Sequence, residues 1–365
     1  MRGLTPPLVA LFCAAGTVAA QPTNVTGGSV TVQSAGRDFP RQIRGLASEP
    51  AARWIAWATP AADGRNHLCC FDSVGSSDDV MCCGRCRLER GGRASADLVE
   101  DRSVRPVRLE APSEVQIFFR VEAGGIRKIR AFSADCAVDA GALLIVWISG
   151  VPAEASVAWL ESLAATQRQA AGDEGDSSVA HSAVAAIAHH AGAPADRALE
   201  RLMARDKPPS LRRKAAFWLG NARGHAGYEA LNRVVPSDPD EDFRKHATFA
   251  LSQSREPEAV GSLIAMAKSD ASPRVRGQAL FWLAQKAGRK AAVTIEEVIR
   301  DDPDTEVKTK AVFALTQMPD GEGVPQLIHV ARTNRNPEVR KKAVFWLEQS
   351  KDPRALAFFE EILTK

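Results

Sequence analysis

The sequence predicts a mainly α-helical protein, in which a small β-rich sandwich or barrel domain precedes a right-handed α-solenoid. One short phrase recurs five times between residues 211 and 349, and its phenylalanines are spaced 32 residues apart. Self-similarity at a period of roughly 20–50 residues is typical of stacked helical repeats. Alternating apolar and polar residues upstream of the repeats predict the β-rich domain. The phenylalanines are Phe217, Phe249, Phe281, Phe313 and Phe345.

The length and composition allow two domains or one extended array. The chain has 365 residues, more than one compact core normally contains. We expect a signal peptide at residues 1–20, a β-rich domain containing cysteines at residues 21–150, and the solenoid at residues 151–365. Apolar residues make up 45% of the chain and charged residues 25%, and a net charge of +3 gives no argument for binding nucleic acid.

The first twenty residues have the three parts of a secretory signal peptide. Arg2 supplies the positive charge, residues 8–12 form the apolar run, and residues 18–20 form a cleavage site of small side chains. No later apolar run reaches the roughly 18 residues that a membrane-spanning helix requires. We therefore expect a periplasmic or secreted protein whose mature chain begins near Gln21.

Short extended runs predict the β-rich domain. The clearest pair, residues 115–121 and 126–130, is joined by a turn with Gly124 and Gly125, which predicts a hairpin. Further strands are predicted at residues 30–33, 54–58, 104–109 and 143–148. This number of short strands is typical of a small sandwich or barrel.

All cysteines of the mature chain lie in the β-rich domain. An even number of cysteines in an exported domain predicts a disulfide framework, although several pairings remain open. A zinc site, a redox-active pair at Cys83 and Cys86, and free thiols are the alternatives, and the spacing departs from that of paired zinc knuckles. The predicted disulfide cysteines are Cys69, Cys70, Cys82, Cys83, Cys86 and Cys136.

Each repeated unit predicts two helices. The second helix carries an apolar stripe, which in the first copy consists of Leu211, Ala215, Trp218, Leu219 and Ala222. The first helix carries one apolar residue, the anchor, that recurs with the same period. The turn between the two helices contains a residue that is usually aspartate, and a basic residue of the second helix follows it six positions later. The anchors are Leu199, Leu231, Leu263, Ile295, Leu327 and Phe359; the turn residues are Asp206, Asp238, Asp270, Asp302 and Asn334; the basic residues are Arg212, Arg244, Arg276, Lys308 and Arg340.

This combination of a turn aspartate and an apolar residue followed by arginine resembles the HEAT repeat. The phrase Arg-x-x-Ala-x-x-x-Leu is similar to the short bacterial type named after the phycobilisome (PBS) lyases, and the resemblance extends over residues 179–363. It implies a superhelix whose second helices line the concave side, with the arginine and aspartate rows bridging neighbouring repeats. Residues 159–187 are expected to contain a degenerate first unit, and the helix at residues 353–363 is expected to close the other end.

The repeated phenylalanines lie away from the apolar stripe of their helices. At about 100° per residue, Phe217 falls about 240° from Leu211, whereas the stripe centres near 20°. We predict an aromatic ridge on the concave face, with amides and a basic rim that includes His246, which would suit an extended, mildly acidic polypeptide. The alternative is that each ring packs sideways against the next repeat. The predicted partner-binding residues are Phe217, Phe249, Phe281, Phe313, Phe345, Gln253, Gln285, Gln317, Gln349, Lys214, Lys310 and Lys342.

The sequence shows no catalytic constellation. HEAT proteins of the deoxyhypusine hydroxylase type bind iron through His-Glu dipeptides, and none of the seven histidines here is followed by glutamate. The pair His189 and His190 is interpreted as a polar helix end that favours basic side chains. We expect a monomeric, non-catalytic scaffold or adaptor that binds a protein or peptide and no cofactor; an enzyme or enzyme accessory on the same scaffold is the alternative.

Overall fold

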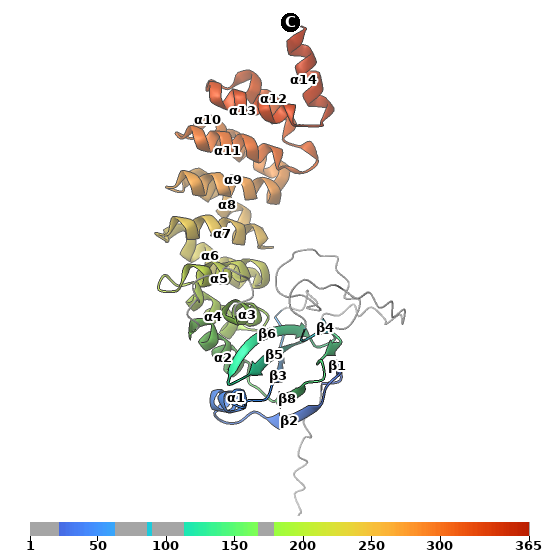
Figure 1. Ribbon diagram of the computed structural model, residues 1–365. Helices are drawn as coiled ribbons and strands as arrows, with labels where there is room; N and C mark the ends of the chain where they lie inside the picture. Colours follow the sequence, from blue (N-terminus) through green and yellow to red (C-terminus); the bar gives the residue numbers. More distant parts are fainter. Residues whose placement is uncertain (1–21, 63–85, 90–112, 167–178, 365) are drawn as a thin grey trace, which may run out of the picture.

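The computed structural model describes residues 22–62, 86–89, 113–166 and 179–364. Within these ranges the molecule is elongated, with a β module at one end and a stack of helices that leads to α14 at the other (Figure 1). The predicted fold class, an α-solenoid after a small β-rich region, is confirmed. The predicted signal peptide and the strand predicted at residues 104–109 lie outside the described residues.

The β module contains two sheets. In the larger sheet the strand order is β2-β8-β3-β5-β6; β8 pairs parallel with β2 and β3, whereas β3/β5 and β5/β6 are antiparallel. The smaller sheet has the order β1-β7-β4 and is parallel. The strands are β1 (Val25–Thr26), β2 (Val30–Ser34), β3 (Arg53–Pro60), β4 (Cys86–Arg87), β5 (Glu114–Glu122), β6 (Gly125–Ser133), β7 (Val138–Asp139) and β8 (Leu144–Ser149).

The predicted hairpin is formed by β5 and β6. Ala123 and Gly124 have φ values of 46° and 74° in its two-residue turn. Positive φ at both central positions gives the tight turn that matches the twist of antiparallel strands, and glycine adopts it without steric cost. The Gly-Gly sequence therefore located the turn correctly.

A helix, α1 (Phe39–Ala47), interrupts the strands and is absent from the predicted elements. Asp38 caps it by accepting a hydrogen bond from the backbone N–H of Arg41, and Phe39, Ile43 and Ala47 form its buried face. Their spacing of four residues is helical, so the signal was present but short. The module is consequently not purely β.

The large sheet buries both of its faces. One face carries Trp54, Phe118 and Trp147, which share a core with the small sheet, as in a sandwich. The other face carries Trp57 and Phe119, whose rings stack at 4.6 Å, and this face belongs to the same apolar cluster as α1 and the helical array. The β module and the solenoid therefore share one continuous core.

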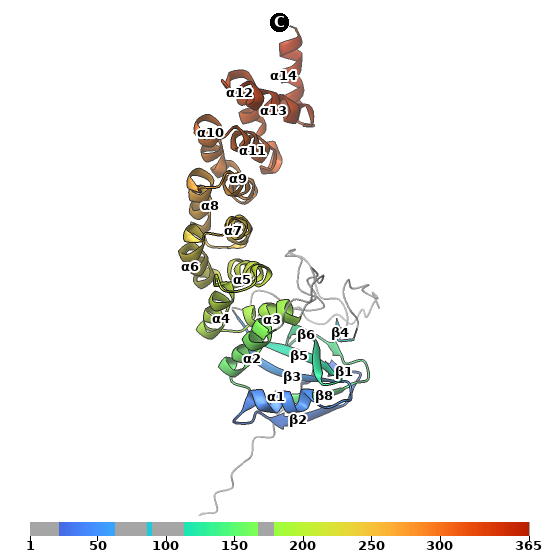
Figure 2. The ribbon, with the colours of Figure 1, turned by 60° about the vertical axis from the view of Figure 1, so that its left-hand side comes forward.

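The array consists of helix pairs, with first helices on one side and second helices on the other (Figure 2). The second helices α3, α5, α7, α9, α11 and α13 line the side toward which the array bends. The helices are α2 (Ala153–Thr166), α3 (Val179–Ala188), α4 (Ala193–Met203), α5 (Pro209–Ala222), α6 (Gly224–Val234), α7 (Glu241–Gln253), α8 (Glu258–Ser269), α9 (Pro273–Ala287), α10 (Ala292–Asp301), α11 (Thr305–Thr316), α12 (Val324–Thr333), α13 (Pro337–Glu348) and α14 (Pro353–Leu363), with short 3-10 turns at Val235–Ser237, Gly288–Ala291 and Pro319–Gly321.

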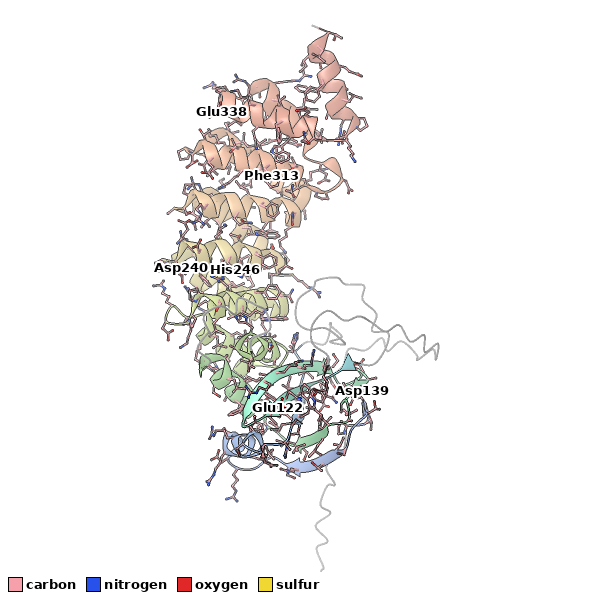
Figure 3. All side chains as sticks on the ribbon, in the orientation of Figure 1. Glu122, Asp139, Asp240, His246, Phe313 and Glu338 are labelled. Atoms are coloured by element: carbon pink, nitrogen blue, oxygen red, sulfur yellow. The ribbon has the colours of Figure 1, made fainter. Side chains whose placement is uncertain are left out.

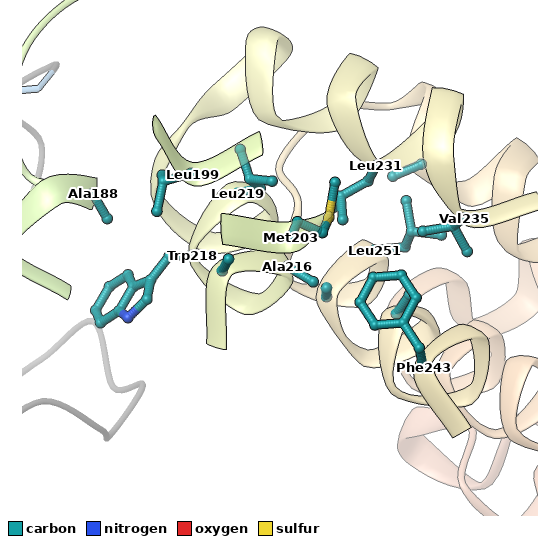
Figure 4. Packing of buried hydrophobic residues seen from close by; sticks show 14 of the residues in the cluster. Ala188, Leu199, Met203, Ala216, Trp218, Leu219, Leu231, Val235, Phe243 and Leu251 are labelled. Atoms are coloured by element: carbon teal, nitrogen blue, oxygen red, sulfur yellow. The ribbon is translucent and has the colours of Figure 1, made fainter. Parts of the chain in front are cut away.

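Five of the six predicted anchors are buried in the core of the array, whereas Phe359 of α14 is only partly buried. Leu199 of α4, Leu219 of α5, Leu231 of α6 and Leu251 of α7 lie in one cluster that continues from repeat to repeat (Figure 4). Each helix pair alone leaves an apolar side open, so stacking supplies most of the burial. Among the described residues, no helix is long and apolar enough to cross a membrane.

Candidate functional site

The arginine and aspartate rows connect neighbouring repeats. Arg276 donates two hydrogen bonds to the carboxylate of Asp302 in the next repeat, at 2.8 and 3.0 Å, and both side chains are largely buried. Asp302 also accepts a hydrogen bond from the backbone N–H of Asp304 at 2.9 Å, which orders the turn before α11. The predicted bridging role is therefore confirmed, and these charges are not available to a ligand. The three connections are Arg212–Asp238, Arg244–Asp270 and Arg276–Asp302.

The fourth connection replaces both members of the pair. Lys308 takes the place of arginine and donates to the backbone carbonyl of Arg300 at 2.8 Å. Asn334 takes the place of aspartate and keeps only the turn hydrogen bond, from the backbone N–H of Asn336 at 2.9 Å. A neutral amide opposite lysine avoids leaving a buried carboxylate without its arginine, which would be strongly destabilising.

The phenylalanine row forms a ladder of aromatic contacts along the second helices. Phe217 stacks on Phe249 with ring centroids 5.7 Å apart and an interplanar angle of 17°. Phe281 stacks on Phe313 in the same way, at 6.0 Å and 12°. Offset stacking at such distances contributes about 0.5–1.5 kcal/mol per pair beyond apolar burial. The rings thus contact the next repeat, as the packing alternative expects.

Tryptophans connect the two stacked pairs. Phe249 packs against Trp282 at 4.8 Å, and Phe313 packs against Trp346 at 5.0 Å. Trp282 in turn meets Phe281 edge to face at 4.8 Å. Helices with Phe-Trp therefore alternate with helices with Phe-Ala, and the contact is continuous from α5 to α13.

The ladder is only partly covered by protein. The rings of Phe217, Phe249, Phe281 and Phe313 are half-buried, and Phe345 is 44% exposed. Each of these rings contacts a neighbouring aromatic ring, and part of each phenylalanine remains at the surface. Packing and surface exposure coexist at these positions, and ligand binding there stays a prediction.

The helix positions three and four before each phenylalanine and four after it contain no carboxylate, whereas Glu348, three residues after Phe345, lies on the same surface. Positions three and four before the ring, and four after it, lie beside it on the same helix face. Amides occupy the last position in every copy, and Gln285 and Gln349 are exposed. The earlier positions carry most of the positive charge of this face. The basic residues are Arg213, Lys214, Lys245, Lys310, Lys341 and Lys342.

Local contacts moderate this positive charge. Lys310 pairs with Glu306 one turn away at 2.7 Å, and the ammonium of Lys342 lies 5.0 Å from the ring centre of Phe345. The sequence places His246 in the basic rim, and this prediction is wrong. Burial and the nearby Arg213 lower the pKa of His246 to about 4. His246 is therefore neutral at pH 7. Figure 3 labels His246 on α7 and Phe313 on α11.

A buried polar chain joins the β module to the first repeat. The indole N–H of Trp57 donates to Ser156 Oγ at 2.8 Å, and Ser156 Oγ lies 2.7 Å from His190 Nε2. His190 Nδ1 is 2.8 Å from the carbonyl of Ala186, an acceptor, so Nδ1 carries the proton and Ser156 donates to Nε2. All three side chains are fully buried, which excludes a substrate from this serine–histidine pair.

The interpretation of His189 and His190 as a basic helix end is wrong. Burial, with a smaller contribution from Arg223, lowers the pKa of His190 to about 4. Arg223 instead supplies the positive charge at this end of α3, donating to the carbonyls of Ala188 and His190 at 2.9 and 2.5 Å. The sequence could not reveal this, because Trp57 and Ser156 come from distant segments.

The structure describes two of the six cysteines that are predicted to form disulfides, Cys86 and Cys136. Cys136 is buried and disulfide-bonded, and Cys86 forms β4 beside Val138. Cys69, Cys70, Cys82 and Cys83 lie outside the described residues, so the pairing stays a prediction. In the part of the chain that the structure describes, no three His, Cys, Asp or Glu side chains form a metal-binding group.

The stacked helix pairs with their bridging arginine–aspartate rows define an α-solenoid. Residues 195–284 and 292–365 match the family model described as HEAT repeats. No curated protein matches the chain.

Two solved structures are similar to the chain at low identity. Human deoxyhypusine hydroxylase in complex with glycerol is 17% identical, with a TM-score of 0.31, over 57% of this chain and 90% of that chain. A structure of the Pds5–Scc1 complex is 14% identical, with a TM-score of 0.34, over 58% of this chain and 40% of that chain. Similarity at this level carries no argument about what the chain does.

Proposed function

We propose that this protein is an exported, non-catalytic scaffold with HEAT repeats of the bacterial PBS-lyase type, which acts as a monomer and binds an extended, mildly acidic polypeptide along its second helices. The observation that carries the proposal is the composition of this face. Five partly exposed phenylalanines are flanked by six basic residues and five amides, which outnumber the neighbouring carboxylates Glu306, Glu338 and Glu348. No cofactor is part of the proposal.

The geometry suits an extended chain. Asparagine and glutamine side chains both donate and accept hydrogen bonds, so the amide row can pair with the backbone of a peptide laid across the repeats. The exposed parts of the phenylalanines supply apolar contact between these amides. The basic residues attract an acidic peptide and raise its association rate. Added salt screens this attraction and lowers the rate.

Charge reversal on the second helices tests this function without replacing any aromatic side chain. The double variant Lys310→Glu/Lys342→Glu changes the proposed face, and Arg197→Glu/Arg300→Glu makes the same charge change on exposed first-helix positions. Fluorescein-labelled extended peptides of about 15 residues, either acidic or basic, are the probes. We expect the acidic peptide to bind the unmodified protein and the first-helix variant, and to lose affinity about tenfold or more on the second-helix variant.

Equal affinity for acidic and basic peptides would reject the proposal. So would equal loss in the two variants, because the effect would then reflect net charge alone. Retained circular dichroism spectra and melting temperatures are the check that both variants fold.

Two further observations test the export and the absence of catalysis. Cys136 is disulfide-bonded, and disulfides persist mainly in oxidising compartments. Alkylation of the denatured, unreduced mature protein should label no cysteine, and uptake of several labels would contradict the framework. Stoichiometric iron or zinc in the purified protein would favour the enzyme alternative.

A further inference from the structure

The strand β2 is the open edge of the large sheet. It pairs with β8 on one side, and no strand of the described chain pairs with its other side (Figure 1). The carbonyl of Ser29 accepts a hydrogen bond from the N–H of Ile145 at 2.8 Å. At the other end, the N–H of Ala35 donates to the carbonyl of Ser149 at 2.9 Å. Because the backbone groups of successive strand residues point to opposite sides, these two contacts fix the direction of every residue between them. The residues whose backbone groups point away from β8 are Val30, Val32 and Ser34.

Most of these outward backbone groups are unpaired. The carbonyl of Ser34 accepts a hydrogen bond from Gln42 Nε2 at 3.1 Å. In the ranges that the structure describes, the N–H groups of all three outward residues and the carbonyls of Val30 and Val32 have no hydrogen-bond partner. Such a row of donors and acceptors is a template for pairing with another extended chain.

The opposite edge of the same sheet is protected. The edge strand β6 carries Arg127 and Lys128, and helix α3 packs against it. Charged side chains and a covering helix are usual devices that keep an edge strand from pairing. In contrast, the sequence of β2, Val-Thr-Val-Gln-Ser, contains no charge and no proline, and its register with β8 is continuous. The sheet therefore blocks one edge and leaves the other available for pairing.

The side chains of β2 specify the pattern of a strand that pairs with it. Val30 and Val32 are half-buried against the core that the two sheets share, whereas Thr31 and Gln33 are exposed. A neighbouring strand continues both rows, because the side chains of paired strands share the faces of the sheet. The occupant of this edge should therefore alternate apolar residues, which extend the valine row, with polar residues.

Positive charge lies at the carboxyl end of β2. Gln42, whose Nε2 donates to β2, also accepts from the N–H of Gly36 at 2.8 Å, so its side chain holds the first turn of α1 beside this end. Arg37 and Arg41 are exposed, and neither forms an ion pair with a carboxylate of the described residues. The carboxylate of Asp38 caps α1 by accepting from the N–H of Arg41 at 3.0 Å. The two arginines favour an acidic residue at this end of the occupant.

We propose that β2 binds one extended segment of a partner protein by β-strand addition, with the segment antiparallel to β2. Antiparallel pairing is slightly more stable per residue than parallel pairing, and it places the N-terminal end of the segment beside Arg37 and Arg41. The segment therefore begins with acidic residues and continues with alternating apolar and polar residues. Main-chain hydrogen bonds supply the affinity, and the valine row and the arginines supply the selectivity. This site lies on the β module and does not depend on the proposed function of the concave face.

Strand addition also predicts which amides of the segment are used. In an antiparallel pair, residues that lie opposite each other share one face of the sheet and, at alternate positions, exchange both backbone hydrogen bonds. The outward backbone groups belong to Val30 and Val32, so the residues opposite them exchange these bonds and lie on the valine face. The N–H groups of the apolar residues of the segment therefore point to β2, and those of its polar residues point away.

A fluorescein-labelled peptide of about eight residues, Glu-Glu-Val-Thr-Val-Thr-Val-Thr, is the probe, and its binding to the full-length protein is measured by fluorescence anisotropy. Two derivatives keep every side chain and carry N-methyl groups either on the valines or on the threonines. We expect saturable binding of the parent peptide. Methylation of the valine amides should weaken it about tenfold or more, because the bonds to β2 are lost, whereas methylation of the threonine amides should leave it nearly unchanged.

Variants of β2 give the matching test on the protein. Val32→Pro removes one outward N–H, and proline is tolerated on an edge strand where the N–H faces away from the sheet. Val32→Ile keeps both the N–H and the apolar side chain and is the matched control. We expect Val32→Pro to weaken binding about fivefold or more and Val32→Ile to bind like the unmodified protein. Circular dichroism spectra and melting temperatures check that both variants fold.

Charge reversal tests the arginines. Arg37→Glu/Arg41→Glu changes the end of β2, and the first-helix variant described above has the same change in net charge. Affinity for the probe should fall about threefold or more at low salt in the former and stay unchanged in the latter. Binding should persist in the second-helix variant described above, so a failure of the proposed function and a failure of this inference give different results.

Several results would overturn this inference. They are the absence of saturable binding, equal affinity for the two N-methylated peptides, and equal affinity of Val32→Pro and Val32→Ile for the probe. Hydrogen exchange measured by NMR on the unliganded protein tests for another part of the chain on this edge. The amides of Val30, Val32 and Ser34 should exchange quickly and those of Thr31 and Gln33 slowly, and protection of all five would overturn the inference. A concentration-dependent dimer in sedimentation that Val32→Pro abolishes would assign the edge to self-association and would overturn it as well.

Discussion

Acidification should weaken the junction between the β module and the solenoid through His190. Burial lowers the pKa of His190 from 6.5 to about 4, and the positive charge of Arg223 adds to the cost of protonation. Between these two values the unfolded chain binds the proton more strongly than the folded chain. Stability therefore rises with pH across this window and is lost as the pH falls from about 6.5 to about 4. The difference corresponds to about 3 kcal/mol at pH 4.

The variant His190→Gln measures this contribution. Its side-chain oxygen can still accept from Ser156, but the side chain does not titrate. At pH 7 the variant should be less stable than the unmodified protein in urea, because the hydrogen bond to Ala186 is lost. By pH 4 the difference in unfolding free energy should shrink by about 3 kcal/mol.

The assay must report on the junction itself, because a repeat array can unfold in stages. Hydrogen exchange of peptides covering β3 and α2, which contain Trp57 and Ser156, provides this local readout. His225→Gln, at a side chain 63% exposed on α6, is the control and should show no such change. A stability gap for His190→Gln that stays constant from pH 7 to pH 4 would refute the reasoning.

Four variants of the array have separate expected costs, each measured by urea unfolding. Asp302→Ala should lower the free energy of unfolding by about 3–5 kcal/mol, because Arg276 then stays buried without its carboxylate. The double variant Arg276→Lys/Asp302→Asn should lose less stability, and equal losses would contradict this account. Gly220→Ala places a methyl group 2.0 Å from the carbonyl of Ala250, so overpacking of about 1–3 kcal/mol should outweigh the better helix propensity of alanine. Phe281→Leu keeps apolar volume and should lose about 0.5–1.5 kcal/mol of stacking, whereas a loss above about 3 kcal/mol would indicate a core residue.

The array was predictable because every element repeats. Five copies of one phrase average out the ambiguity of any single helix, and the first helices are located by anchors such as Leu263 and Leu327. The β module has no such repetition. Helix α1 has only one apolar stripe, from Phe39 to Ala47, and the strand order depends on pairings between distant segments, such as β2 with β8.

The candidate site shows the limit of reasoning from one helix. The angle of Phe217 correctly separates it from the apolar stripe of α5. That angle describes an isolated helix and takes no account of the next repeat. In the structure, Phe249 of α7 stacks on one face of the Phe217 ring. In the same way, His246 is three residues before a partly exposed phenylalanine, yet packing across repeats partly buries it and lowers its pKa. Neighbours from other repeats therefore decide exposure and charge.

Alternation between repeats links the packing of the array to its surface. Tryptophan follows phenylalanine in α5, α9 and α13, whereas alanine follows it in α7 and α11. Trp282 packs between the Phe217–Phe249 pair and the Phe281–Phe313 pair, so the natural unit of this surface is two repeats. The middle copy, α9, has Gly277 and Gln278 where the other copies have basic residues or threonine and histidine. The positive charge is consequently divided between α5–α7 and α11–α13, on either side of a neutral centre. An extended ligand with acidic residues near both ends and an apolar middle matches this distribution better than one with uniform charge.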